Sequence, residues 1–244
     1  MSDNLGSIIL GMGEVGSAHY RILSDVYPAW GVDKVIELNK TNQDTATPPV
    51  GQILHVCIRY SETFTEAVNQ AIKDYQPMAL NICSTVPCGT TESFSENACH
   101  STTRGLHPNL EVGLRTIKKH VGGGAAPQMK DYFQAAGIFC EIHLKSRTTE
   151  LLHILNNSHY GINLMFADEA AKLCRLYGVD YYDYMKYTES NNAGYRAIGH
   201  ATKVRPILTP PNGKIGGHCV NMSAGLIPDD LKTPLIAELS KYGN

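Results

Sequence analysis

The sequence has no long apolar run and no excess of charge of one sign. No segment approaches the roughly 20 apolar residues that a membrane-spanning helix needs, which argues against a membrane partner. Lys and Arg number 21 and Asp and Glu 23, and a formal net charge of −2 predicts no general attraction to nucleic acid or anionic lipid. The first ten residues lack a basic segment followed by a long apolar one, so no signal peptide is predicted.

Cysteines at metal-binding spacing are missing as well. The seven cysteines are scattered and form no CxxC pair, so no metal site is predicted. Their odd number, in a chain large enough to fold without disulfides, indicates a reducing, cytoplasmic location. The 244 residues are 43% hydrophobic and 18% charged, which is typical of a globular chain with one large domain, or a main domain followed by a smaller one.

A glycine-rich turn lies near the amino end. Ser7–Leu10 is predicted as a strand, and apolar residues recur at helical spacing from Ala18 to Val26. A Gly-x-Gly-x-x-Gly turn between a strand and a helix is typical of dinucleotide binding, because the free N–H groups of the helix N-terminus face the pyrophosphate. The predicted phosphate-binding residues are Gly11, Met12, Gly13, Glu14, Val15 and Gly16.

An acidic residue follows the next predicted strand. Ala29–Val32 is expected to be that strand, and Asp33 lies 22 positions after Gly11 (33 − 11). This spacing suits the carboxylate that accepts hydrogen bonds from the adenosine ribose, and an acid there repels the 2′-phosphate of NADP. NAD is therefore the predicted cofactor. Glu37 is an alternative, since Val35–Leu38 can also be interpreted as a strand.

Strands and helices then alternate, which predicts a doubly wound α/β sheet. Strands are expected over residues 53–58 and 78–84, with a helix at Phe64–Tyr75 between them and a loop at 40–49. Ligands of such sheets bind beyond the carboxyl ends of the strands. The polar residues expected there are Arg59, Tyr60, Ser84 and Thr85.

The pattern changes near residue 148. From Thr149 to Tyr177 there is no proline and apolar residues recur at helical spacing, which predicts one long helix ended by Gly178. A second helix is predicted over 181–187, with irregular chain after Asn191. The predicted domains are therefore a Rossmann domain, 1–147, and a smaller all-α domain, 148–244.

Glu150, His153 and Asn157 share one face of the long helix, and Gly161 continues this stripe one turn later. A solvated helix face is one interpretation. The other is an active-site wall, where His153 exchanges a proton with a substrate hydroxyl, Asn157 holds the same oxygen and Gly161 leaves room for the ligand.

Cys219 follows two glycines and a histidine in a turn-rich segment. Lys214 nearby would favour its thiolate, which makes Cys219 a candidate nucleophile. A small buried hydrophobe is the alternative, and it is the expected role of the other six cysteines.

In four motifs the chain resembles the UDP-glucose/GDP-mannose 6-dehydrogenases. These motifs are the glycine turn, the Ser84–Thr91 segment, the Glu150-to-Asn157 helix and Ile215–Cys219. The resemblance reaches the first two domains of that family, and the nucleotide-sugar-binding domain that follows in its members is expected to be absent. It implies an NAD-dependent oxidation of a nucleotide sugar in polysaccharide biosynthesis, and a homodimer through the helix 149–177.

The resemblance also implies roles for single residues. Cys219 matches the nucleophile that captures the aldehyde, Asn157 the helix asparagine and Thr85 the threonine near the nicotinamide. Glu150 matches the acid that begins the helix motif. Two positions differ, because the catalytic lysine of the family is His153 here and its aspartate after the cysteine is Ser223.

These differences leave three functions open. The first is oxidation of an alcohol with NAD, in which a histidine near its usual pKa of about 6.5 replaces the lysine as proton acceptor. The loss of the aspartate leaves two-electron and four-electron outcomes open. The second is a β-hydroxyacid-dehydrogenase-like enzyme acting on a small hydroxy acid. The third is a non-catalytic dinucleotide-binding sensor or partner subunit.

Overall fold

The computed structural model describes residues 5–211 and 218–242, with only the backbone of His218, Cys219 and Asn221. The chain forms two compact units, Met1–His153 and Ile154–Asn244. The division falls inside the long helix α5 (Ser146–Tyr177), six residues after the predicted end of the first domain at residue 147.

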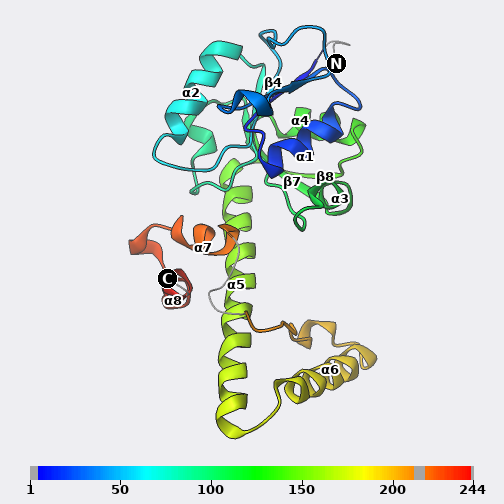
Figure 1. Ribbon diagram of the computed structural model, residues 1–244, viewed down its shortest axis with the longest axis vertical. Helices are drawn as coiled ribbons and strands as arrows, with labels where there is room; N and C mark the ends of the chain where they lie inside the picture. The colour runs from blue at the N-terminus through cyan, green and yellow to red at the C-terminus, as the bar shows by residue number, and fades with distance from the viewer. Residues whose placement is uncertain (1–4, 212–217, 243–244) are drawn as a thin grey trace. The chain divides into compact units, whose positions relative to one another are not determined.

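The first unit is built on one eight-stranded sheet with the order β3-β2-β1-β4-β5-β6-β7-β8. Strands β2, β1, β4, β5 and β6 run parallel, β3 pairs antiparallel with β2, and the parallel pair β7 and β8 joins antiparallel to β6. The predicted doubly wound α/β fold is confirmed (Figure 1). The strands are β1 (Ser7–Leu10), β2 (Ala29–Val32), β3 (Lys40–Thr41), β4 (Ile53–Val56), β5 (Ala79–Ile82), β6 (Ala98–His100), β7 (Lys119–Gly123) and β8 (Cys140–His143).

Helices cover both faces of this sheet. Successive strand residues point to opposite faces, so Ile53 packs with α1, α3 and α4 whereas Leu54 packs with α2. Figure 1 shows α2 on one side of the sheet and α1, α3 and α4 on the other. The helices are α1 (Glu14–Leu23), α2 (Phe64–Tyr75), α3 (Leu110–Thr116) and α4 (Ala126–Ala135).

The second unit is helical. It contains most of α5, then α6 (Tyr181–Ala197), α7 (His218–Gly225) and α8 (Pro234–Lys241). Gly178, with φ of +67°, follows α5 as predicted, in the left-handed conformation that ends many helices. Val220, Ala224 and Leu239 form a small core against α5.

Some predicted boundaries are wrong. The second helix, predicted over 181–187, extends to Ala197, because no proline interrupts residues 188–197. The predicted loop at 40–49 contains the two-residue edge strand β3. Val35–Leu38 is not a strand, since Ile36–Leu38 forms a 3₁₀ turn.

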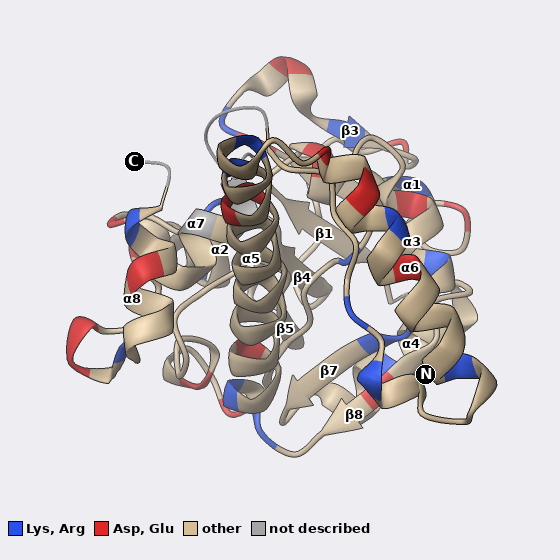
Figure 2. Cartoon of the chain, turned by 90° about the horizontal axis from the view of Figure 1, so that it is seen from below, with Lys and Arg blue, Asp and Glu red and all other residues tan. Residues whose placement is uncertain are grey.

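Acidic and basic positions are interspersed along the ribbon in the view of Figure 2. Within the described ranges, no helix has the length and apolar composition needed to cross a bilayer.

Within the glycine turn, Gly16 lies closest to neighbouring backbone. A Cβ at Gly16 would lie 1.8 Å from the carbonyl oxygen of Gly11, whereas a Cβ at Gly13 would meet nothing within 4 Å. Replacing glycine by alanine inside a helix is ordinarily favourable by about 1 kcal/mol. We nevertheless expect Gly16→Ala to lower the free energy of unfolding by about 1–3 kcal/mol, because helix and strand must separate. Urea denaturation measures this, with Gly13→Ala as the matched control that keeps wild-type stability; equal stability of Gly16→Ala would contradict the prediction.

Candidate functional site

The glycine turn joins β1 to α1 at the carboxyl edge of the sheet. Gly11 has φ of +94°, a conformation that other residues rarely adopt. Gly13 precedes α1 and faces open space, so its backbone is accessible to a ligand. The turn therefore meets the steric requirements of a pyrophosphate at a helix N-terminus.

Asp33 directly follows β2 and lies beside this turn. Its Oδ2 accepts a hydrogen bond from Met12 N at 2.7 Å, and its Oδ1 accepts one from Val35 N at 3.0 Å. A carboxylate offers about four lone-pair sites, so both oxygens can still accept ribose hydroxyls. Glu37, the alternative, is exposed in the 3₁₀ turn. The residues present thus fit the adenosine half of NAD.

The segments after β4 and β5 are joined by Ser84. Its hydroxyl donates to the carbonyl of Ile58 at 2.6 Å and also approaches that of Val56 at 3.2 Å. Arg59 is exposed at the same edge, and the Tyr60 ring packs against Phe64 with centroids 5.3 Å apart. Ser84 is therefore a structural connection, and Arg59 is the residue here that stays accessible to a ligand.

His153, on α5, is held between two threonines. Its Nε2 lies 3.1 Å from Thr85 Oγ1 and its Nδ1 lies 2.9 Å from Thr102 Oγ1. In a neutral imidazole one nitrogen donates and the other accepts, so the two hydroxyls and the ring form a directional chain. Such a chain can pass a proton between its ends.

Burial sets the charge of His153. Burial, together with the smaller effect of the positive charges of Arg104 and Lys119, lowers the pKa of this histidine to about 4. The expectation of a pKa near 6.5 is therefore wrong, and the ring is neutral at pH 7. The neighbouring His100 is also held neutral, because burial lowers its pKa to about 3.

Glu150 positions the segment that carries Thr85. Its buried carboxylate accepts hydrogen bonds from Gly89 N at 2.5 Å and from Thr91 N at 2.8 Å. One helical turn separates Glu150 from His153, so the same contacts also fix the position of His153 along the helix axis relative to Thr85. These contacts give Glu150 a positioning role, and its predicted catalytic role stays a prediction.

The remaining predicted residues belong to the second unit. Asn157 donates from Nδ2 to the buried Ser223 Oγ at 2.9 Å. Gly161 leaves room for protein, not for a ligand, because a Cβ there would lie 2.4 Å from Val220 Cγ1. Lys214 and the side chain of Cys219 lie outside the described residues, so their roles remain predictions.

Three site residues were missed by sequence reasoning. Thr102 follows β6, Arg104 lies two residues later, and Lys119 begins β7 with its Nζ 3.2 Å from the carbonyl oxygen of Thr102. Thr102 could have been found as a polar residue after a strand, had β6 been recognised. The burial of Lys119 depends on β7 running antiparallel to β6, which no local pattern shows.

Comparison with known proteins gives a nucleotide-sugar dehydrogenase by sequence, and both nucleotide-sugar and hydroxyacid dehydrogenases by fold. No family model matches the sequence. The UDP-N-acetyl-D-mannosamine dehydrogenase of Methanococcus maripaludis is 25% identical over a 182-residue alignment that covers 70% of this chain and 39% of that protein. The chain is similar to nucleotide-sugar dehydrogenases. This confirms the resemblance that its motifs indicated.

Solved structures agree on the fold. A UDP-D-ManNAc dehydrogenase from Pyrococcus horikoshii matches 97% of this chain and 68% of its own, with a TM-score of 0.79 and 18% identity. A 3-hydroxyisobutyrate dehydrogenase from Mycobacterium tuberculosis matches 98% of this chain and 92% of its own, with a TM-score of 0.69 and 12% identity.

The neutral His153 predicts a pH dependence of stability. The unfolded chain protonates histidines near pH 6.5, whereas the folded ring stays neutral until about pH 4. The unfolded state therefore binds more protons in this window, and the free energy of unfolding should fall as the pH is lowered through it. We expect urea denaturation between about pH 7.5 and pH 5 to show a shallower decline for His153→Gln than for the wild type.

His159, exposed on the same helix, supplies the matched control. His159→Gln should keep the wild-type pH dependence. An identical slope for His153→Gln and the wild type would show that the His153 ring is not held neutral by the fold.

Proposed function

We propose that this chain is the dinucleotide-binding part of an NAD-dependent oxidoreductase that oxidises a hydroxyl group of a nucleotide sugar. The observation that carries the proposal is the His153 ring held between Thr85 and Thr102, at the same sheet edge as the glycine turn. The substrate class comes from the similarity to a UDP-N-acetyl-D-mannosamine dehydrogenase. The chain spans 39% of the length of that relative, so the whole activity belongs to this proposal.

In the proposed reaction, separate residues bind the cofactor and act on the substrate. Gly11, Gly13 and the N-terminus of α1 bind the pyrophosphate, and Asp33 binds the ribose. NAD, when bound, accepts a hydride from the substrate carbon. The hydroxyl proton is released in the same reaction, and His153 accepts it directly or through Thr85. The positive charges of Arg104 and Lys119 favour the developing alkoxide.

The proposed roles of Asn157 and Cys219 come from the sequence motifs. Asn157 would hold the substrate oxygen, and Cys219 would act as nucleophile or substrate contact, with Lys214 as a neighbouring cation. Ser223 cannot act as the anionic base that an aspartate would be, so a two-electron oxidation is the outcome that this chain's residues favour.

Turnover of NAD tests this function. Purified full-length chain with NAD and a panel of nucleotide sugars should form reduced nicotinamide, detected by absorbance. We expect His153→Gln to lower kcat by about 10²–10⁴-fold, with little change in the Kd for NAD, because the ring acts on the proton and not on the cofactor. His159→Gln should keep wild-type kcat. Tight NAD binding without turnover of any hydroxyl compound would instead support a non-catalytic dinucleotide sensor.

A β-hydroxyacid dehydrogenase is the second candidate. The fold similarity to 3-hydroxyisobutyrate dehydrogenase covers nearly the full length of both chains, which favours it. A panel of small hydroxy acids, assayed beside the nucleotide sugars, separates the two. Cys219→Ala should be tolerated if the substrate is a simple hydroxy acid.

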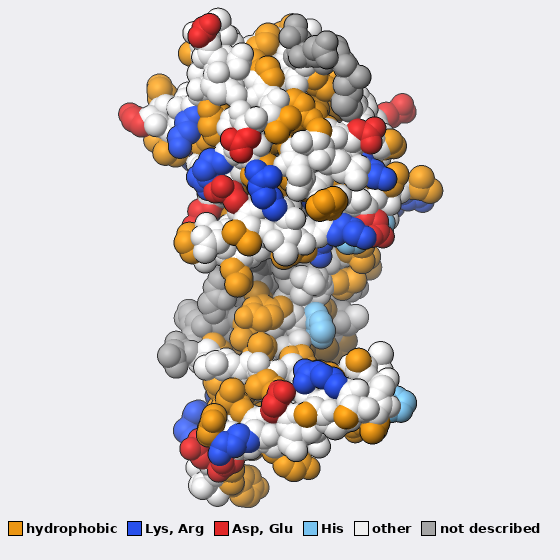
Figure 3. Space-filling view, turned by 90° about the vertical axis from the view of Figure 1, so that its right-hand side faces the viewer, with side chains coloured by type: hydrophobic (Ala, Val, Ile, Leu, Met, Phe, Trp, Pro, Cys, Tyr) orange, Lys and Arg blue, Asp and Glu red, His pale blue; other side chains and the backbone are white. Residues whose placement is uncertain are grey.

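We also propose that α5 supports a homodimer. Four large apolar side chains on its second half are mostly exposed, from 56% to 77%, and Figure 3 shows hydrophobic side chains on this unit's surface. Single exposed apolar residues are ordinary, but a row along one helix marks an association surface. These residues are Phe166, Leu173, Leu176 and Tyr177.

Light scattering measures the oligomeric state. The wild type should have the mass of a dimer, and Leu173→Glu combined with Leu176→Glu should reduce it to a monomer, because two buried charges would face each other without partners. Val112→Glu, an equivalent change at an exposed site on α3, should leave the dimer intact. A wild-type monomer at micromolar concentration would contradict the proposal.

A further inference from the structure

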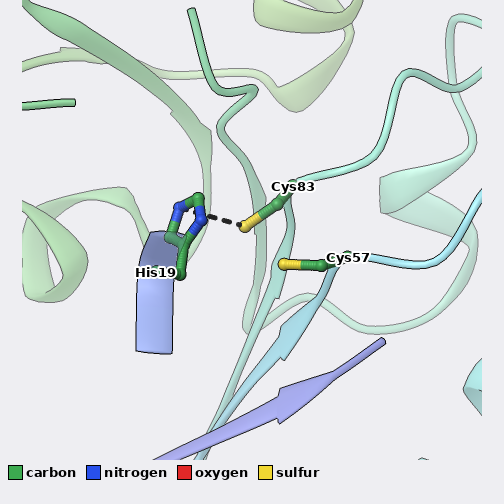
Figure 4. Close-up of side chains that lie close together, drawn as sticks. All are labelled: His19, Cys57 and Cys83. Carbon is green, nitrogen blue, oxygen red and sulfur yellow. Dashed lines mark hydrogen bonds between the residues drawn. The ribbon is translucent and has the colours of Figure 1, made fainter. Parts of the chain in front are cut away.

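A cluster of three side chains that the candidate site does not use lies in the first unit: His19, Cys57 and Cys83. His19 lies on α1, Cys57 follows β4 and Cys83 follows β5. Their candidate ligand atoms all lie within 4.8 Å of one another. Figure 4 shows the imidazole and both sulfur atoms pointing toward a common centre.

The sheet register accounts for the pairing of the two cysteines. Val56 and Ile82 are partners in the parallel β4–β5 pair, so the residues that follow them are neighbours as well. Both thiols are free within the described part of the chain. This proximity is absent from the sequence spacing, which is why the chain shows no CxxC signal.

A backbone contact fixes the ring of His19. Its Nδ1 lies 3.0 Å from the carbonyl oxygen of Val15, and a carbonyl can only accept, so Nδ1 carries the proton. The lone pair is then on Nε2, which lies 3.8 Å from Cys83 Sγ. This is the arrangement by which metal-binding histidines are oriented, with the outer nitrogen donating to a carbonyl.

The sulfur of Cys83 also has an outer partner. Asn81 donates from Nδ2 to this sulfur at 3.1 Å. Hydrogen bonds of this kind support thiolate ligands. Asn81 also contacts His55, whose buried Nε2 has no hydrogen-bond partner among the described residues. The cluster therefore lies in a polar part of the interior, and its groups are held in place from outside.

We propose that His19 Nε2, Cys57 Sγ and Cys83 Sγ bind one zinc ion. Imidazole with two thiolates is a ligand set that zinc prefers, at distances of about 2.0–2.1 Å for nitrogen and about 2.3 Å for sulfur. Two thiolates neutralise the divalent cation, and binding releases the two thiol protons to solvent. Cys57 is half-buried, and a zinc ion with three protein ligands would take water as its fourth.

Lys119 would compete with zinc for the lone pair of His19 Nε2. Its Nζ lies 3.4 Å from His19 Nε2 and 3.2 Å from the carbonyl oxygen of Thr102. Zinc would replace the first contact, while the second holds the ammonium group in place. Zinc affinity should therefore depend on all three ligands and should rise with pH.

The site lies within the dinucleotide-binding sheet. A Cβ at Gly11 would lie 3.0 Å from the Cys57 carbonyl carbon, so Cys57 packs directly beneath the glycine turn. A bound ion would connect α1 to the ends of β4 and β5. This inference does not require the proposed oxidoreductase activity.

Zinc binding to the reduced, full-length protein tests the proposal. Calorimetric titration with zinc chloride should give one ion per chain, and Co²⁺ in its place should show thiolate-to-metal charge-transfer absorption. Cys57→Ser and Cys83→Ser should each lower zinc affinity by about 10-fold or more and remove that absorption. The thermal unfolding midpoint should rise with zinc in the wild type and not in these variants.

Two controls keep the result specific. Cys140→Ser removes a half-buried thiol of β8 outside the cluster and should bind zinc as the wild type does. His120→Gln removes one member of a separate surface group, His120, Glu141 and His143, and should also leave the affinity unchanged. Loss of binding in His120→Gln, unchanged binding in both serine variants, or no binding by the reduced wild type would each overturn the proposal.

Discussion

The attachment of α5 to the strand ends is the constraint on which the candidate site depends. Glu150 accepts backbone hydrogen bonds from the segment after β5, and Thr149 contacts His100 at the end of β6, with 2.9 Å between Oγ1 and Nδ1. Both contacts are buried, where an unmade hydrogen bond costs about 1–3 kcal/mol. The register of the helix is therefore fixed, and His153, one turn later, has one available position between Thr85 and Thr102.

The electrostatics of the first unit follow from the same packing. Burial keeps His153 and His100 neutral, and it lowers the pKa of Lys119 as well. A neutral ring keeps a lone pair that can accept a proton, and in the proposed reaction the nearby positive charges would favour an anionic substrate oxygen. This differs from a lysine at position 153, which would bring its own charge to the helix.

Local patterns were sufficient for the parts of the fold in which neighbouring residues decide the structure. The boundaries of β1, β2 and α2, and the end of α5 before Gly178, match what residue spacing predicts. The antiparallel entry of β7 and the site residues Thr102 and Lys119 could not be predicted, because they depend on which strand ends meet. The same reason hides the cluster of His19, Cys57 and Cys83, whose members come from three separate elements.

The two departures from the family pattern both replace a charged residue by a neutral one. His153 stands where the family has a cation, and burial keeps it neutral. Ser223 stands where the family has an anion, and it is fully buried with its hydroxyl bonded to Asn157. A lone buried aspartate at 223 would need a cation or several donors to offset its desolvation, whereas a serine hydroxyl carries no charge to offset. Together the two replacements remove one positive and one negative formal charge, so the net charge is the same as with the lysine and the aspartate.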